Sequence, residues 1–363
     1  MDAISRLSWW HVIIFLIVII VGMRFAKKTH SKVVTSFVCL ILICVSGLRH
    51  GYIDTRGYRN WFIGLNRAEV LKLEYLFNGD EKDRGFSFLL GIIKLFTDNS
   101  QVCLFILAFI TVGLLFWGIV KHVPRADLGV FLFITTGCYL DTMNGVRQAL
   151  VAAVLFYCLP KFLEENKIMK YMILVLLMST IHGSAILFIP LYFVVTKKAW
   201  SNYTWGIICG SLVFYAFYNT GIGAGLVAIL EGTSYGDDYG QMLLTGNTSV
   251  NIIRIMVAAI PIVMSYFTKR YKEKESPFYN IAFNMSLINL MTWIFATKVL
   301  YFYRLGMYFI PYMIILQCYE MEFLRRSENR RLVKFTASIC YLIYFIYQLY
   351  IMGDQFFVGY LKY

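Results

Sequence analysis

The chain of 363 residues carries 59% hydrophobic residues, 15% charged residues and a mean hydropathy of +0.64. A soluble domain of this length does not have such a composition, because its surface needs more polar and charged side chains. The net charge of +13 does not require a nucleic-acid partner, since basic loops at one face of a membrane give the same excess. We therefore predict an all-α, polytopic integral membrane protein.

Apolar stretches long enough, or nearly long enough, to cross about 30 Å of hydrocarbon recur along the whole chain. They predict about twelve transmembrane helices, at roughly 9–24, 33–48, 101–120, 128–141, 146–162, 171–182, 183–196, 203–220, 252–268, 278–297, 303–322 and 335–352. The first is followed by basic residues without a small-residue cleavage site, so we expect a retained span and not a signal peptide. Residues 171–196 form either one long helix or two short ones.

No stretch resembles a separate soluble domain, so residues 1–363 are predicted to form one membrane domain. Loops after the odd-numbered spans contain 20 of the 34 Lys and Arg but 8 of the 21 Asp and Glu. Placing these loops in the cytoplasm gives about +12 inside and about +1 outside, as the positive-inside rule requires. Loops 49–100 and 221–251 then lie outside the cytoplasm, and 85–96, too short to span, is expected to dip into the membrane.

The cysteine pattern and the spacing of possible metal ligands argue against disulfides and against a metal site. The eight cysteines fall within or at the ends of apolar stretches, and no two have C-x-x-C spacing. This pattern indicates neither a disulfide framework nor a zinc site. The extracytoplasmic side also lacks residues at the spacing of metal ligands. We expect no metal ion and no cofactor.

Polar and charged side chains gather at the extracytoplasmic ends of the predicted spans and in the first outer loop. Ionisable residues at membrane depth are costly and usually mark a pathway or a site. Each of these residues also has an explanation that involves no functional site. It could belong to a solvated loop, it could be an arginine that extends to the lipid headgroups, or it could form a hydrogen bond between helices. The candidates are Arg49, Asp54, Arg56, Asp83, Arg84, Asn144, Arg147, Gln148, His182, Arg304 and Tyr308.

Arginine is the most informative member of this set. Its planar guanidinium binds phosphate through two hydrogen bonds and stays charged at membrane depth. Several arginines that converge from outside the cytoplasm therefore indicate an anionic, phosphorylated and lipid-linked substrate. Tyrosine and tryptophan on the same side would stack on sugar rings or form the interfacial belt.

Five segments follow one another along the chain: RHGYIDTRGYRNWF, DRGFSFLLGII, NGVRQALVAAVLFYCLPKFLEENK, STIHGSAILFIPLYF and YFYRLGMYF. In this order and spacing they resemble the EpsG-type family of Wzy-like polysaccharide repeat-unit polymerases. The resemblance covers roughly residues 45–315, and NGVRQALVAA and IHGSA are its most specific parts. The usual family pattern has a glutamate before the glycine–aromatic pair, where this chain has Asp83-Arg84-Gly85-Phe86.

The resemblance implies a multi-pass enzyme of the bacterial inner membrane. Such an enzyme joins oligosaccharide units, carried on undecaprenyl diphosphate, at the periplasmic face during O-antigen, capsule or exopolysaccharide assembly. Its partners are the lipid-linked oligosaccharide, the bilayer and possible chain-length regulators, with no nucleic acid. The glycine-rich loop 221–251 would then be a lid or a glycan-binding segment.

To join two units, the enzyme transfers a glycan from its lipid diphosphate to a sugar hydroxyl of the next unit. The leaving diphosphate then needs positive charge nearby. We assign that task to Arg147 and Arg304, with Arg49 or Arg56 assisting, because fixed guanidinium groups in a dry site strongly stabilise developing phosphate charge. The NGVRQ segment is expected to place this clamp at a helix N-terminus, whose partial positive charge adds to it.

The attacking sugar hydroxyl needs a base. His182 is one candidate, because histidine titrates near neutral pH, and Asp54 is its rival. Asn144 and Gln148 would orient the substrate from one helix face, being four residues apart. Further candidates for substrate binding are Asp83, Arg84 and Tyr308.

Two other functions fit part of the pattern. A flippase or transporter of lipid-linked oligosaccharide would also have an arginine-lined cavity, but transporters tend to have two matching halves, and 1–180 and 181–363 do not match. A membrane O-acyltransferase acting on surface glycan would need a catalytic histidine reachable from the cytoplasm. The near-cytoplasmic His30 and His122 lie in short basic loops.

Overall fold

The computed structural model describes residues 32–49, 52–77, 83–218, 251–268, 278–298, 302–324 and 330–357. These ranges contain sixteen α-helices and one short 3-10 helix, with no strand among them. The prediction of an all-α chain is therefore confirmed. The predicted span 9–24 lies outside the described residues, and so does the predicted loop 221–251 except for its last residue.

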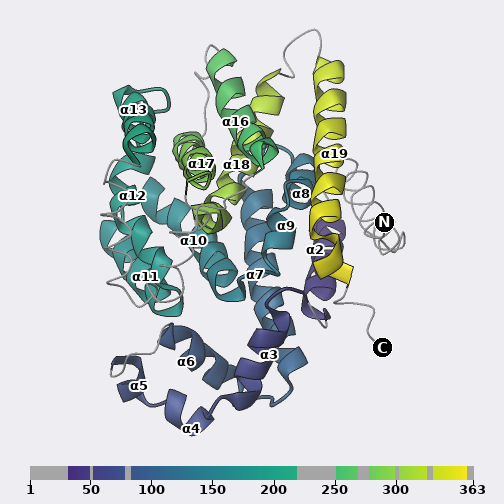
Figure 1. Cartoon of the computed structure of the whole chain (residues 1–363), viewed down its shortest axis with the longest axis vertical. Helices are drawn as coiled ribbons and strands as arrows, with labels where there is room; N and C mark the ends of the chain where they lie inside the picture. The colour runs from purple at the N-terminus through teal and green to yellow at the C-terminus, as the bar shows by residue number, and fades with distance from the viewer. Residues whose placement is uncertain are drawn as a thin grey trace.

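Most of the longer helices run side by side in one bundle (Figure 1). The helices of this bundle are α2 (Lys32–Gly47), α7 (Ser100–His122), α8 (Ala126–Thr135), α10 (Val146–Glu164), α11 (Ile168–Ile181), α12 (Phe188–Val195), α13 (Asn202–Phe217), α16 (Ile252–Phe267), α17 (Phe278–Phe295), α18 (Phe302–Leu324) and α19 (Arg330–Phe357). Helix α10 packs on α7, α11 and α18. It is therefore central to the bundle, and its N-terminal turn has neighbours on several sides.

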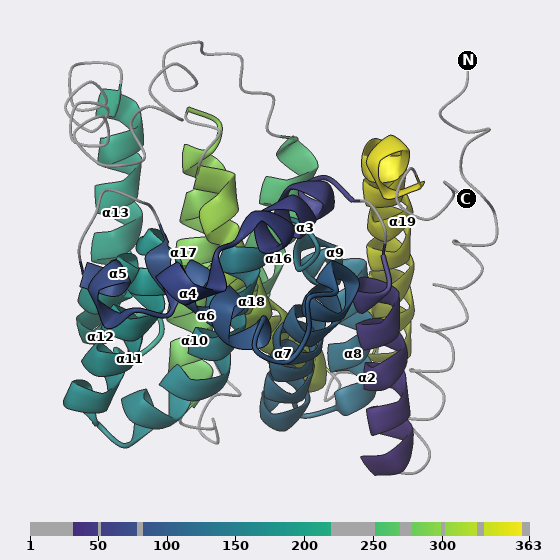
Figure 2. The ribbon, with the colours of Figure 1, turned by 90° about the horizontal axis from the view of Figure 1, so that it is seen from below.

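Four shorter helices lie across the lower end of this bundle in Figure 1 and in front of it in Figure 2. They are α3 (Thr55–Gly64), α4 (Arg67–Val70), α5 (Leu73–Phe77) and α6 (Arg84–Ile93), and we call them the transverse layer. All four have ten residues or fewer, so they are too short to cross a bilayer upright. Helix α6 covers the segment that was expected to dip into the membrane.

The transverse layer is held to the bundle by an apolar cluster, and two of its own helices are joined by hydrogen bonds to backbone carbonyls. Phe62 and Phe86 of the layer pack in one buried cluster with Leu107 of α7 and Leu150 of α10. The Lys94 ammonium donates to the carbonyl oxygens at the end of α3, at 2.9 to 3.0 Å. The last carbonyls of a helix lack the partners found in its interior, and a cation is favoured at that end of the helix dipole.

One predicted span, 128–141, is interrupted, and the stretch 171–196 forms two α-helices and not one long helix. The stretch 128–141, predicted as one span, consists of α8 and the short α9 (Cys138–Asp141), because Gly137 between them has φ +85°. A left-handed residue ends a helix, and glycine adopts it at little cost. The stretch 171–196 consists of α11, η1 (Gly183–Leu187) and α12, with His182 in an extended conformation at the break.

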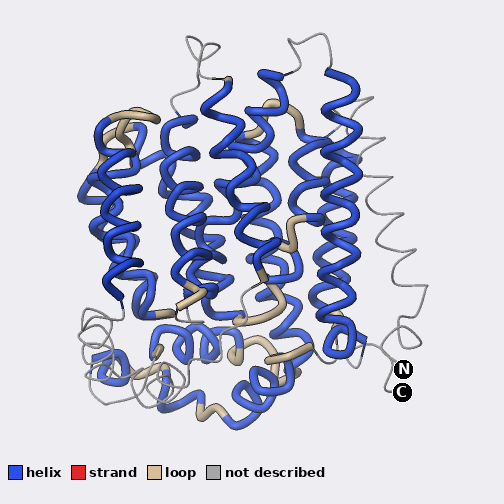
Figure 3. Tube along the Cα trace, turned by 45° about the horizontal axis from the view of Figure 1, so that its top comes forward, coloured by secondary structure: helices blue, strands red, loops and turns tan. Residues whose placement is uncertain are grey.

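The predicted number of twelve transmembrane helices is not confirmed. Within the described ranges, α7 and α10 are the two helices both long enough and apolar enough to cross a membrane, by length and composition. Shorter apolar helices of 10–17 residues accompany them. Figure 3 shows the bundle helices side by side with the transverse layer across one end.

Candidate functional site

The NGVRQ segment lies where α10 begins. Gly145 has φ +64°, and the helix starts at the next residue, in agreement with the predicted helix start. The Gly145 N–H donates to Asp54 Oδ2 at 3.1 Å, and the Arg147 N–H donates to the Tyr58 hydroxyl at 3.5 Å. These two N–H groups therefore already have acceptors and are not available to an anion at this end of α10.

Asp83 brings several of the predicted residues together. Its Oδ2 accepts from Arg147 Nη1 at 2.5 Å and lies 3.3 Å from His182 Nδ1, and its Oδ1 accepts from the Gly183 N–H at 3.2 Å. The Asp83 side chain is 2% exposed. Arg147 also lies over the Trp61 ring, 5.0 Å from its centroid. This cluster therefore joins the transverse layer to α10 and to the break after α11.

Burial raises the pKa of Tyr58, which packs beside this cluster, and the Arg147 guanidinium opposes that shift. The Tyr58 ring is stacked with Trp61 and meets Phe86 edge-on. A phenol in these surroundings stays protonated at neutral pH and acts as a hydrogen-bonding group.

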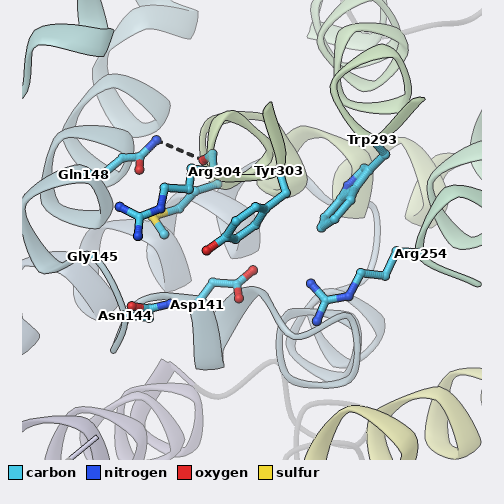
Figure 4. Close-up of a pocket in the computed structure, with 9 residues that line it drawn as sticks. Asp141, Asn144, Gly145, Gln148, Arg254, Trp293, Tyr303 and Arg304 are labelled. Carbon is cyan, nitrogen blue, oxygen red and sulfur yellow. Dashed lines mark hydrogen bonds between the residues drawn. The ribbon is translucent and has the colours of Figure 1, made fainter. Parts of the chain in front are cut away.

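A pocket lies at the same end of the bundle, on another side of α10. Figure 4 shows it at the meeting point of α9, α10, α16, α17 and α18. Each of these helices contributes a residue from one of its ends, so the pocket is formed where helices start or stop. Its lining residues are Asp141, Asn144, Gly145, Gln148, Arg254, Trp293, Tyr303, Arg304 and Met307.

The charged groups of the pocket face one another across it. The guanidinium groups of Arg304 and Arg254 approach from opposite sides of the Asp141 carboxylate and the Tyr303 ring (Figure 4). Gln148 Nε2 donates to the Arg304 carbonyl oxygen at 2.9 Å, which links α10 to the first turn of α18. Arg254 lies over the Trp293 ring, 5.3 Å from its centroid.

The structure thus divides the predicted residues between two groups of contacts. Asn144, Gln148 and Arg304 line the pocket. Arg147 follows Asn144 closely in sequence but contacts Asp83. Because a helix advances about 100° per residue, adjacent side chains such as those of Arg147 and Gln148 point in different directions.

Arg49, proposed to assist the clamp, is 2% exposed and is held by local contacts. Its guanidinium donates to Thr55 Oγ1 at 3.0 Å, to the Ser46 carbonyl oxygen at 2.5 Å and to the Met143 carbonyl oxygen at 3.5 Å. These contacts fix the chain between α2 and α3. Arg49 does not line the pocket.

The other predicted residues lie outside the pocket lining as well. Tyr308 is buried, with its hydroxyl 2.9 Å from that of Ser184. Arg84 donates to the Tyr75 carbonyl oxygen at 3.3 Å, and Arg56 is exposed on α3.

The sequence interpretation missed Asp141, Arg254 and Trp293. Arg254 satisfies the criterion that selected Arg304, because it is a lone arginine at the extracytoplasmic end of a predicted apolar span. Asp141 is the last residue of the predicted span 128–141. Trp293 lies within an apolar run, so no local signal distinguishes it from a residue of the core.

Chemically, the pocket offers two cations, one carboxylate and two aromatic faces. Guanidinium groups bind phosphate oxygens, aromatic faces stack on sugar rings, and a carboxylate accepts a proton or a hydrogen bond. Within the described ranges no three His, Cys, Asp or Glu side chains gather as ligands of a metal ion.

Comparisons with known proteins agree with the resemblance seen in the sequence. Searches of curated proteins and of solved structures gave no match. The sequence model of the EpsG family matches residues 32–362, nearly the whole chain. That family has a polymerase-like role in polysaccharide biosynthesis, and the apolar helices are consistent with a membrane protein. The chain therefore belongs to the EpsG family, which is of the Wzy-like polymerase type.

Proposed function

We propose that the protein polymerises undecaprenyl-diphosphate-linked oligosaccharide repeat units into surface polysaccharide. It would do so by block glycosyl transfer, as a multi-pass enzyme of the bacterial inner membrane whose site faces the periplasm. One observation carries the proposal: two guanidinium groups and a carboxylate meet in a pocket at the ends of five helices. The family membership supplies the reaction class.

The reaction explains why a pocket would contain two arginines. As the glycan leaves its lipid carrier, negative charge develops on the diphosphate, and preorganised cations stabilise it. Arg304 and Arg254 face each other across the pocket, so each could bind one phosphate group. The Trp293 and Tyr303 rings offer surfaces on which a sugar would stack.

We assign the diphosphate to Arg304 and Arg254 in preference to Arg147. The Arg147 guanidinium is bound to the buried Asp83 carboxylate and lies over Trp61. Releasing it would break a charge-assisted hydrogen bond, which contributes about 1.5 to 3 kcal/mol. Arg147 is therefore better suited to hold the transverse layer against α10.

The periplasmic orientation has support from helix polarity. Helix α7 begins next to the transverse layer, where Arg59 Nε donates to Ser100 Oγ at 3.3 Å, and it has Lys121 in its last turn. Helix α10 also begins there and has Lys161 in its last turn. Basic residues at the end far from the layer favour a cytoplasmic location for that end.

The test is deletion of the gene in its native host, followed by sizing of the lipid-linked and surface glycans on a gel. We expect surface glycan of a single repeat unit, restored to long chains by the wild-type gene. Lipid-linked units retained on the cytoplasmic side, with no glycan at the outer face, would instead identify a flippase.

Complementation with point variants tests the pocket. Arg304→Lys and Arg254→Lys keep the charge but lose the planar two-point contact. Removing one such donor costs about 10²- to 10³-fold in turnover, so long chains should be lost at normal protein abundance. Arg67→Lys, an exposed change in the transverse layer, is the matched control. Long chains from both pocket variants would reject the assignment.

A further inference from the structure

The transfer also needs a group that removes the proton from the attacking sugar hydroxyl. Such a group must face the pocket that holds the donor, because a base acts within about 3 Å of the proton it accepts. Among the described residues that line the pocket, Asp141 is the one with a carboxylate, and there is no histidine among them. Its side chain points between Asn144 and Arg254 (Figure 4).

The two bases considered from the sequence are held elsewhere. Asp54 Oδ2 accepts the N–H of Gly145, and His182 Nδ1 lies 3.3 Å from the Asp83 carboxylate. Neither residue lines the pocket. Both would have to leave these contacts to reach a substrate bound between Arg254 and Arg304.

We propose that Asp141 is the general base of the glycosyl transfer, an inference that rests on the proposed function. The Asp141 carboxylate takes the proton of the acceptor hydroxyl as its oxygen attacks the anomeric carbon of the donor glycan. The new glycosidic C–O bond forms while the C–O bond to the diphosphate breaks. The diphosphate leaves with that electron pair, and its charge is held by the two arginines.

The charge of a neighbouring arginine links the proton affinity of Asp141 to binding of the donor diphosphate. Burial of the Asp141 carboxylate favours its protonated form, and the positive charge of Arg254 opposes this by favouring the ionised form. A bound diphosphate would neutralise the charge of Arg254, so the proton affinity of Asp141 would be higher with the donor in place. The pocket thereby links donor binding to activation of the acceptor.

The alternative is that Asp141 only positions Arg254. The two roles differ in their effect on the lipid carrier. If Asp141 is the base, replacing it with asparagine removes a negative charge from the pocket, so an anion should bind equally well or more tightly. If Asp141 instead holds Arg254 in place, the same change should weaken anion binding as Arg254→Lys does.

The experiment uses the purified full-length protein in lipid nanodiscs. The substrate is the lipid-linked repeat unit extracted from the deletion strain, and the binding probe is undecaprenyl diphosphate. Asp141→Asn, Asp141→Glu and Arg254→Lys are compared with Asp98→Asn, the same chemical change at an exposed carboxylate. The initial rate of chain extension is measured as a function of pH, beside the dissociation constant of the probe.

For Asp141→Asn we expect a rate about 10² to 10⁴ times lower, loss of the acidic limb of the pH–rate profile, and probe binding no weaker than that of the wild type. Asp141→Glu should recover part of the rate because it restores a carboxylate. An Asp141→Asn rate near that of the wild type, or probe binding weakened as in Arg254→Lys, would overturn the proposal. Failure of the wild type to extend any chain would reject the proposed function itself.

Discussion

The contact between the transverse layer and the bundle can be tested at Asp83. This residue has φ +56°, a left-handed conformation that Asp and Asn tolerate better than most residues. Asp83→Asn therefore keeps the backbone and the side-chain shape and removes the charge. The amide can still accept from the Gly183 N–H, but its NH₂ group then faces the donors of Arg147.

The expected cost follows from the geometry of that contact. A hydrogen bond to a charged group contributes about 1.5 to 3 kcal/mol net. The Arg147 side chain is 29% exposed, so water replaces part of the lost interaction, and the lower part of the range applies. We expect about 1.5 to 2 kcal/mol, which corresponds to about a 10- to 30-fold change in the equilibrium for local opening.

Hydrogen–deuterium exchange measures this opening directly. In Asp83→Asn the backbone amides of α6 should lose about 10- to 30-fold in protection, because α6 follows the residue that anchors it. The amides of α7 serve as an internal reference and should not change. Asp98→Asn, an exposed substitution shortly after α6, is the matched control. Wild-type protection of α6 in Asp83→Asn would refute the assignment of Asp83 as the anchor.

Two further predictions concern the same layer. A Cβ at Gly85 would lie 2.3 Å from Thr180 Oγ1 and 2.8 Å from the Thr180 carbonyl carbon, whereas a Cβ at Gly57 would meet no atom within 4 Å. Gly85→Ala should therefore destabilise the protein by about 1 to 3 kcal/mol. Gly57→Ala, inside α3, should instead stabilise it by about 0.5 to 1 kcal/mol. Thermal denaturation in detergent measures both changes. Because burial raises the pKa of Tyr58, the unfolded chain releases that proton first as pH rises above about 10, so stability should fall there. Tyr58→Phe should lack this part of the fall, and equal pH dependence of the two melting temperatures would contradict it.

The sequence predicted the helices well because their signal is local. The stretches 146–162 and 252–268 correspond to α10 (Val146–Glu164) and α16 (Ile252–Phe267). A run of apolar residues with a polar residue, glycine or asparagine at its end is enough to mark such a helix. The family was also recognisable from sequence, because its motifs keep their order and spacing along the chain.

The break at 128–141 was harder to predict. Gly137 lies inside an apolar run, where glycine is common in membrane helices and does not by itself mark an end. In the structure the Gln348 side chain of α19 approaches that turn, and its Nε2 donates to the Thr135 carbonyl oxygen at 3.3 Å. A partner 213 residues away in the chain thus satisfies the backbone where α8 ends.

The sequence by itself determined the all-helical class, most helix boundaries, the family and the presence of arginines at helix ends. Only the tertiary structure decided which of those arginines face one another. Arg147 and Gln148 are adjacent in sequence, yet one contacts Asp83 and the other lines the pocket with Arg254 and Arg304. The physical reason is that a side chain's direction depends on the helix turn, and its neighbours depend on how separate helices pack.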